Sequence, residues 1–431
     1  MQILILPEYP YPTNHAVVET VYERLLPERG HVVHMIRPGL GVKQPEVREA
    51  PWGEGSLRLF PHEPLGSAAS NILRRLRESR YLDVMMREME AVKIDAVLVR
   101  NDLLYVQRAL RFCRRRSIPL LYQVSSPDAE FRIRRGRAAG AKGSYQLIRG
   151  QYDLRVRRRL CRKADVVLPI SDAMRDYMVD TEKLDPARVF SFPMGCSNGA
   201  LSPIEQIATI KRQLNLPEGK TIVYSGVIDP VRDPGFMLDV LETVQKTLPE
   251  AVLLILTHIT DDRRRSLERQ AAGRRLPVKF VGPLHHSEVS LYLRSSDVMI
   301  SPYPPMFEHS VCSPTKSLEA LGVGLPVVGS AEVADHVEVF QRSGGGIATA
   351  TNVPAFAGAI VSLLSDADKR RMMGEQGRRW VLAHRTYGTL TAYLESIMQN
   401  ARSREALKEL PHSNDTSRET EAECLDQWAT G

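Results

Sequence analysis

The stretch that decides the fold is SPTKSLEALGVGLPVV, residues 313–328. Ser313 is of the type that caps helices, Pro314 suits a first helical turn, and Leu318 and Leu321 have the spacing of a helix face that meets a core. A glycine-containing break and an apolar run follow, as they do where a helix returns to a buried strand. The stretch therefore predicts a capped helix that leads into a sheet.

The start of this helix also carries candidate binding residues. Its free N–H groups and positive dipole end favour a phosphate, and Lys316 adds a charge in the first turn. Glu319 lies one turn along on nearly the same face, where its carboxylate can accept hydrogen bonds from ribose hydroxyls. An ordinary capped surface helix with a chance Lys and Glu pair would have the same residues. The candidate nucleotide-binding residues here are Ser313, Pro314, Thr315, Lys316 and Glu319.

Short apolar runs alternate with helical patterns on both sides of this stretch. In the second half we expect strands at residues 221–225, 252–257, 278–281, 298–301 and 326–329, with helices near 236–246, 287–294 and 316–321. In the first half we expect strands at residues 3–6, 31–36, 95–100, 119–124, 165–170 and 189–192. Between the first two strands, apolar residues from Val17 to Leu26 form one helical stripe that ends before Gly30. This succession predicts the α/β class, with doubly wound parallel sheets.

The length of 431 residues is too great for one ordinary core. We expect two doubly wound Rossmann-like domains, residues 1–200 and 201–380, joined by a linker around 194–203 that is rich in Gly, Ser and Asn. From about residue 401 the sequence turns polar, which predicts a flexible tail over residues 401–431. Domains of this kind bind ligands where the carboxyl ends of their strands face each other across a cleft.

Composition indicates a water-soluble protein. The hydrophobic fraction is 43% and the charged fraction 25%, and no window approaches the about 18 consecutive apolar residues of a membrane span. The N-terminal apolar run lacks a basic lead and is too short for a signal peptide, so we expect cytoplasmic residence. The five scattered cysteines include no Cys-x-x-Cys pair, which argues against disulfides and structural zinc.

Positive charge is concentrated in one segment of a chain whose net charge is +7. Residues 132–163 contain twelve Lys or Arg against one acid, Asp153, and Ile148 and Tyr152 interleave at partly helical spacing. The basic face could meet phosphates or anionic lipid head groups, which would place the protein peripherally at the inner face of a membrane. A solvated helix face would show the same pattern. Nucleic acid is a less favoured partner, because no aromatic stacking platform or RNA-binding motif accompanies the charges.

A second candidate phosphate site follows the strand expected at residues 221–225. Gly226 would let backbone N–H groups approach a phosphate, and Arg232 could supply a bidentate charge. A glycine-containing turn with a nearby arginine is common, so an ordinary surface loop is also compatible with these residues.

Residues 313–328 resemble the nucleotide-binding segment of the GT-B glycosyltransferases of group 1 (family 4-like), in which the pattern Ser-Pro-x-Lys-x-x-Glu-x-x-x-x-Gly-x-Pro-Val recurs. Further stretches resemble the family in the same order, and together they span about residues 1–400: residues 29–33, 164–171, 192–195, 280–284, 372–378 and Tyr387. This joint order is more specific than any single motif.

The resemblance implies a glycosyltransferase with two Rossmann-like domains that face across a cleft, and a helix at residues 381–400 that crosses back to the first domain. Glu319 would bind the ribose, and Arg232 and Lys316 would bind the diphosphate. The turn that contains Leu284 would contact the base. The donor would be a UDP- or GDP-linked sugar, used without cofactor or metal and with retention at the anomeric carbon. The acceptor would be a cell-surface glycan or a lipid-linked one.

The sequence departs from the family pattern in both halves. Val311 stands eight residues before Glu319, where the family often has an acid that touches the donor sugar, and Glu308 in a shifted loop is the available substitute. Val227 replaces the arginine that usually follows the loop glycine. The Gly-Gly loop and the histidine of the first domain are also replaced. The candidates for acceptor or donor-sugar contacts are Asn14, His15, Asp102, Ser126, Glu308 and His309.

Two rival functions stay open at this point. A nucleotide-sugar epimerase of similar shape would keep a diphosphate site and isomerise its donor without an acceptor. A catalytically silent relative that binds a partner enzyme would be consistent with valine at positions 227 and 311.

Overall fold

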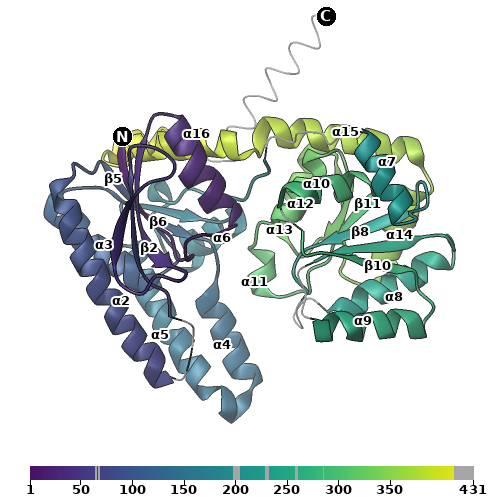
Figure 1. The fold of residues 1–431 in the computed structure, drawn as a ribbon, viewed down its shortest axis with the longest axis horizontal. Helices are drawn as coiled ribbons and strands as arrows, with labels where there is room; N and C mark the ends of the chain where they lie inside the picture. Colours follow the sequence, from purple (N-terminus) through teal and green to yellow (C-terminus); the bar gives the residue numbers. More distant parts are fainter. Residues whose placement is uncertain are drawn as a thin grey trace, which may run out of the picture. The chain divides into compact units, whose positions relative to one another are not determined.

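The computed structural model describes residues 1–63, 66, 68–197, 204–228, 233–257, 261–284 and 286–411. The chain forms two compact units, each a mostly or wholly parallel sheet with helices on both faces (Figure 1). The first unit contains Met1–Pro193 and the C-terminal segment that begins at Tyr387, and the second is Met194–Thr386. The sequence predicted the boundary between the two domains after residue 200. This predicted boundary falls within residues 198–203, which lie outside the described part of the chain.

The first sheet has the strand order β3-β4-β2-β1-β5-β6-β7, and all its pairs are parallel except β3 with β4. Strands β1, β2, β5, β6 and β7 were predicted because they are buried on both faces and therefore nearly continuous in apolar residues, whereas β3 and β4 were not predicted. The strands are β1 (Gln2–Leu6), β2 (Val32–Gly39), β3 (Glu46–Glu49), β4 (Ser56–Pro61), β5 (Ala96–Arg100), β6 (Leu120–Val124) and β7 (Val166–Pro169).

The strand expected at residues 189–192 is wrong. Val189 makes an isolated bridge to Val167, and only the N–H groups of Phe190 and Phe192 donate to β7 carbonyls. Pro193 follows and has no N–H group to continue a ladder.

The apolar stripe predicted from Val17 forms a helix, and this helix, η1 (Val17–Leu25), is a π-helix. The helices of the first unit are η1, α1 (Leu26–Glu28), α2 (Ala68–Glu88), η2 (Met89–Ala91), α3 (Leu103–Arg116), α4 (Asp128–Ala138), η3 (Gly140–Gly143), α5 (Ser144–Cys161), α6 (Asp172–Asp176), η4 (Tyr177–Thr181), η5 (Pro186–Arg188), α16 (Tyr387–Asn400) and α17 (Arg404–Lys408).

The C-terminal helices complete the first unit. Helix α16 packs on η1, and Glu395 binds the guanidinium of Arg29 and lies 3.0 Å from His31 Nε2. Helix α17 occupies part of the segment expected to be a flexible tail. It is ordered because Leu407 is buried and Arg404 pairs with Asp185.

The second sheet is parallel throughout, with the order β10-β9-β8-β11-β12-β13. Its strands are β8 (Thr221–Ser225), β9 (Val252–Leu256), β10 (Val278–Val281), β11 (Val298–Ser301), β12 (Val327–Ser330) and β13 (Gly346–Thr349). Its helices are α7 (Ile204–Gln213), α8 (Pro234–Gln245), α9 (Asp261–Gly273), α10 (His286–Arg294), α11 (Phe307–Ser310), α12 (Thr315–Gly322), α13 (Ala334–Ser343), α14 (Val353–Leu364) and α15 (Ala367–His384).

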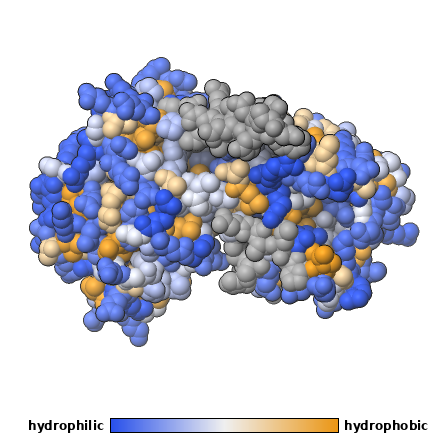
Figure 2. All heavy atoms as spheres, turned by 90° about the horizontal axis from the view of Figure 1, so that it is seen from above, coloured by the Kyte–Doolittle hydropathy of each residue, from blue (hydrophilic) through white to orange (hydrophobic). Residues whose placement is uncertain are grey.

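Burial in the second unit is centred between the sheet and helices α8 and α14, where Phe236 meets Phe356 edge to face at 5.3 Å. On the molecular face seen in Figure 2, hydrophobic residues are scattered in small groups among hydrophilic ones. Within the described ranges, no helix combines the length and hydrophobicity needed to cross a bilayer.

Candidate nucleotide-binding site

The carboxyl-end edge of the second sheet carries the candidate nucleotide residues. Because all six strands are parallel, the loops that follow β8, β10 and β11 emerge at this same edge. Gly226 follows β8 with φ of 155°, and its N–H group donates to the Leu256 carbonyl at 3.0 Å. Leu284 follows β10 and is half-buried. Arg232 lies outside the described residues, so its contact with a diphosphate stays a prediction.

Helix α12 brings the predicted Lys316 and Glu319 together. Lys316 Nζ lies 2.8 Å from Glu319 Oε2, and the carboxylate is the less exposed of the two groups. Leu318 and Leu321 are buried, as their spacing predicted. The helix ends where Gly324 takes a left-handed conformation, with φ of 82°, and lets the Leu325 N–H group donate to the Ala320 carbonyl.

Ser313 does not cap α12, so this prediction is wrong. Pro314 occupies the cap position without a side-chain hydrogen bond, and Thr315 is the first helical residue. Ser313 is instead buried, and its hydroxyl donates to Asp335 Oδ2 at 2.8 Å. The hydroxyl is turned away from the helix because it also accepts from the Met194 N–H group at 3.1 Å.

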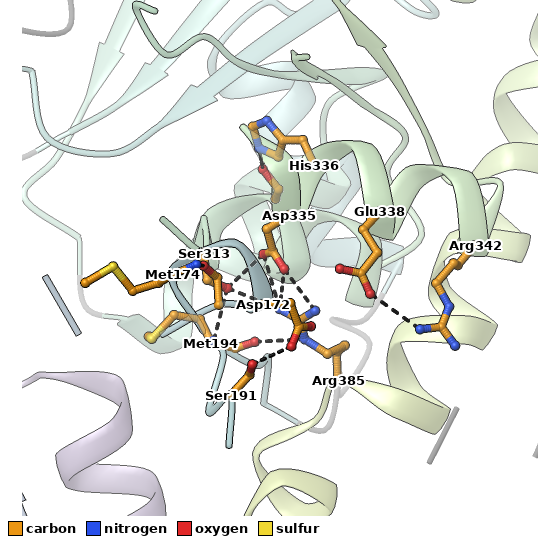
Figure 3. A network of polar contacts seen from close by, with 12 residues as sticks. Asp172, Met174, Ser191, Met194, Ser313, Asp335, His336, Glu338, Arg342 and Arg385 are labelled. Carbon is orange, nitrogen blue, oxygen red and sulfur yellow. Dashed lines mark hydrogen bonds and ion pairs between the residues drawn. The ribbon is translucent and has the colours of Figure 1, made fainter. Parts of the chain in front are cut away.

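A buried ion pair holds this segment (Figure 3). The Arg385 guanidinium lies 3.0 Å from Asp335 Oδ1 and 3.2 Å from Oδ2, and it donates to Ser313 Oγ at 3.1 Å. Its Nε donates to the Met194 carbonyl at 3.2 Å. The network thus joins α13, the residues before α12 and the chain just after α15. Sequence reasoning missed it, because no short-range pattern links residues so far apart along the chain.

His336, next to Asp335 on α13, supports the inner side of α12. Its Nε2 lies 2.9 Å from Ser317 Oγ and its Nδ1 lies 3.2 Å from the Ser330 carbonyl. The ring stacks on Phe340 with centroids 5.2 Å apart. Burial lowers the pKa of His336 to about 4, so the imidazole is neutral near pH 7.

Helix α11 carries two further candidates, Glu308 and His309. Both are half-buried, and His309 Nδ1 lies 2.7 Å from the Pro304 carbonyl. Val311, at the position where the family often has an acid, is buried. A carboxylate at this position would lose its hydration, which accounts for an apolar residue here. Among the described residues, no three His, Cys, Asp or Glu side chains gather as a metal site.

His15 lies in the first unit, near the carboxyl ends of β1 and β5. Its ring stacks on Tyr9 with centroids 4.2 Å apart, and its Nε2 lies 3.4 Å from Arg100 Nη2. Burial lowers the pKa of His15 to about 3, and the charge of Arg100 acts in the same direction. Arg100 in turn pairs with Glu8, an ion pair that sequence reasoning missed although both residues stand at the ends of apolar strands.

The other three candidate residues of the first unit differ in their exposure and in the hydrogen bonds that they already make within the protein. Asn14 is exposed, and the Ser126 hydroxyl donates to Asp128 at 2.5 Å. Asp102 has a structural role, because its carboxylate accepts from the Leu104 N–H group at 2.9 Å as the cap of α3 and pairs with Arg75 at 2.8 Å. Contact of these three residues with a sugar stays a prediction.

Comparison with known proteins bears on the family and the fold of the chain. The family model for glycosyl transferases group 1 matches residues 206–380, and the model for glycosyltransferase family 4 matches residues 19–197. A curated relative, D-inositol 3-phosphate glycosyltransferase of Kineococcus radiotolerans, is 24% identical over 266 residues, which are 56% of this chain and 59% of the relative. The chain therefore matches less than two thirds of that relative's length.

Solved structures share the fold across nearly the whole chain. Sucrose-phosphate synthase from Thermosynechococcus elongatus superposes with a TM-score of 0.70 at 19% identity, covering 93% of this chain and 98% of that one. HepE of Anabaena in complex with UDP-glucose gives 0.67 at 14% identity, covering 93% and 100%. The catalytic domain of starch synthase IV from Arabidopsis thaliana, bound to ADP and acarbose, gives 0.66 at 11% identity, covering 94% and 99%. The fold is GT-B, and because the two family models together match most of the chain, the protein belongs to the group 1, family 4-like glycosyltransferases.

Proposed function

We propose that the protein transfers a sugar from a nucleotide-diphosphate donor to a hydroxyl group of an acceptor. The observation that carries this proposal is the Lys316 and Glu319 pair at the start of α12, with 2.8 Å between ammonium and carboxylate. The pair offers a cation for a diphosphate and, one turn along, an acceptor for ribose hydroxyls. Two structural relatives are bound to UDP-glucose and to ADP, which is consistent with a nucleotide ligand for this chain.

The leaving diphosphate gains negative charge as the sugar departs, and positive groups that face it lower the barrier. Lys316, the α12 N–H groups and Arg232 would supply this stabilisation from the protein itself, without cofactor or metal. We propose retention at the anomeric carbon by same-face attack of the acceptor, in a step that needs no protein nucleophile. The donor would be a UDP- or GDP-linked hexose.

The acceptor would bind in the first unit, near the carboxyl ends of its strands. His15 and Ser126 offer hydrogen-bonding groups there, and His15 is neutral because of its lowered pKa. A neutral imidazole suits a hydroxyl-rich acceptor better than a cationic one would. We propose a glycan or lipid-linked glycan, used at the cytoplasmic face of a membrane.

Thermal unfolding with UDP, GDP and ADP tests the nucleotide site. A ligand at 100-fold excess over its Kd should add about 2.7 kcal/mol to the unfolding free energy. Stabilisation by one nucleotide then selects the donor for a transfer assay with an acceptor panel. If none of the three stabilises the protein, the proposal fails in favour of a silent binding partner. Isomerised donor in the absence of acceptor would instead identify an epimerase.

A further inference from the structure

Helices α4 and α5 project from the first unit as an antiparallel hairpin (Figure 1). Three large apolar side chains on α5 are exposed: Tyr145 at 61%, Ile148 at 68% and Tyr152 at 56%. Their spacing places them on one helix face, and the same face continues through Arg155 and Arg159, which are also exposed. The outer face of α5 is therefore apolar over its first half and basic over its second.

The packing of α4 against α5 does not involve these apolar side chains. A Cβ atom on Gly143 would meet the Gly136 carbonyl oxygen at 2.1 Å, and one on Gly150 would meet the Ala129 carbonyl oxygen at 2.8 Å. The two helices thus touch through their backbones. This close packing leaves the larger residues of α5 directed outward on a rigid support.

The basic residues of the segment fall into two groups. The first group is neutralised within the fold. Arg157 is buried and pairs with Glu130 and Glu182, and Arg132 and Arg149 both pair with Asp153. The sequence prediction that the whole segment forms one basic surface is therefore wrong for Arg157, which is buried, whereas Arg132 and Arg149 stay partly exposed and share the Asp153 carboxylate.

The second group remains at the surface. Its members are exposed and form no ion pair with another described residue: Arg135, Arg137, Lys142, Arg155 and Arg159. Nearby positive charge is dense, since Arg159 and Arg114 both lower the pKa of Lys163. Of these, Arg155 and Arg159 continue the face of α5 that carries Tyr145, Ile148 and Tyr152, and we call these five residues the hairpin face.

We propose that the hairpin face docks on the surface of an anionic lipid bilayer. Tyrosine and isoleucine side chains suit the boundary between head groups and acyl chains, and the flanking cations match lipid phosphates. Two observations disfavour other partners. Arg149 lies over the Tyr152 ring at 6.0 Å, which obstructs the stacking of a base, and a second copy would bring like charges together. This inference goes beyond sugar transfer and does not depend on the nucleotide site.

Flotation of the full-length chain with vesicles tests the proposal. We expect binding to phosphatidylcholine vesicles that contain phosphatidylglycerol, weak binding to phosphatidylcholine alone, and loss of binding at high salt. Changing Tyr145, Ile148 and Tyr152 to Ser, or Arg155 and Arg159 to Gln, should each lower vesicle affinity about tenfold or more. The matched control is Arg269→Gln with Arg379→Gln, two exposed cations of the second unit, and should bind as the wild type does.

Three outcomes would overturn the proposal: no flotation of the wild type with anionic vesicles, equal loss of binding in the control variant, or RNA binding or dimer formation that depends on the hairpin face while vesicles stay unbound. Melting temperature and its shift by nucleotide report whether each variant is folded. Unchanged shifts in variants that no longer float would separate the hairpin face from the nucleotide site.

Discussion

Lys316 Nζ lies 2.8 Å from Glu319 Oε2, so the two side chains expected to hold different parts of a nucleotide are bound to each other. An i, i+3 pair on a helix surface contributes only about 0.2–0.5 kcal/mol. A diphosphate can therefore replace the carboxylate as the partner of Lys316 at small cost. The Glu319 carboxylate would then accept hydrogen bonds from the ribose.

We predict that Glu319→Ala weakens nucleotide binding without unfolding the chain. Hydrogen bonds to a charged group are worth about 1.5–3 kcal/mol, so the Kd should rise about tenfold or more. Calorimetric titration with the nucleotide selected by thermal unfolding measures the change. Glu338→Ala is the matched control, because Glu338 forms a comparable pair with Arg342 on α13. An unchanged Kd in Glu319→Ala would contradict the ribose role.

Replacing Lys316 should affect the diphosphate and spare the nucleoside. We predict that Lys316→Gln raises the Kd for the nucleoside diphosphate about tenfold or more, since a charge-assisted contact is lost. The Kd for the free nucleoside should stay as in the wild type. Parallel titrations of both ligands give the comparison. Equal losses for both would mean that the substitution distorts α12 instead of removing a phosphate contact.

The buried Arg385 and Asp335 pair should be important for stability. In Asp335→Ala the Arg385 guanidinium would remain buried with no carboxylate beside it, which costs about 3–5 kcal/mol. Urea unfolding at pH 7 measures the loss, with Glu338→Ala again as the control on the same helix. A loss as small as that of the control would show that the pair does not hold the segment before α12.

The sequence predicted those parts of the fold that repeat at short range. Strands such as β1 and β8 are buried almost throughout, so their apolar runs identify them. Strands β3, β4 and β13 were missed. Strand β3 is mostly exposed, and β4 and β13, with the sequences SLRLFP and GIAT, interrupt their apolar residues with polar or small ones. None of the three has the continuous apolar run of a central strand.

The site was predicted less completely than the fold. The α12 spacing correctly brought Lys316 and Glu319 together, because helix geometry fixes neighbours three residues apart. The role of Ser313 depends on its hydrogen bonds with Asp335 and Arg385, which are distant in the sequence and come close only through tertiary packing. Local propensity favours a capping role for a serine before a helix, and here a buried ion pair outweighs that preference.

Tertiary packing also distinguishes Arg157 from Arg159, which lie two residues apart and carry the same charge. Arg157 is 4% exposed at its side chain and is held by Glu130 and Glu182, whereas Arg159 is exposed. We predict that Arg157→Gln lowers the unfolding free energy by about 3–5 kcal/mol, because Glu130 loses the guanidinium that binds both of its oxygens and the buried Glu182 loses one of its two arginine partners. Arg159→Gln should change it by less than about 0.5 kcal/mol. Chemical unfolding of the two single variants decides this, and equal stabilities would refute the assignment.

Acid should destabilise the second unit through His336. Its pKa is about 4 in the folded chain, against 6.5 for a histidine in water, so the unfolded state binds the proton more readily. The stabilising contribution is therefore complete above pH 6.5 and is lost as the pH falls toward 4. By linkage, about 2 kcal/mol should disappear between about pH 7 and pH 5 from this residue alone.

His15 acts in the same direction, so the measurement compares the wild type with His336→Asn by urea unfolding at both pH values. The variant should be less stable at the higher pH but lose about 2 kcal/mol less on acidification. Equal pH dependence in the two proteins would mean that His336 takes up its proton without unfolding.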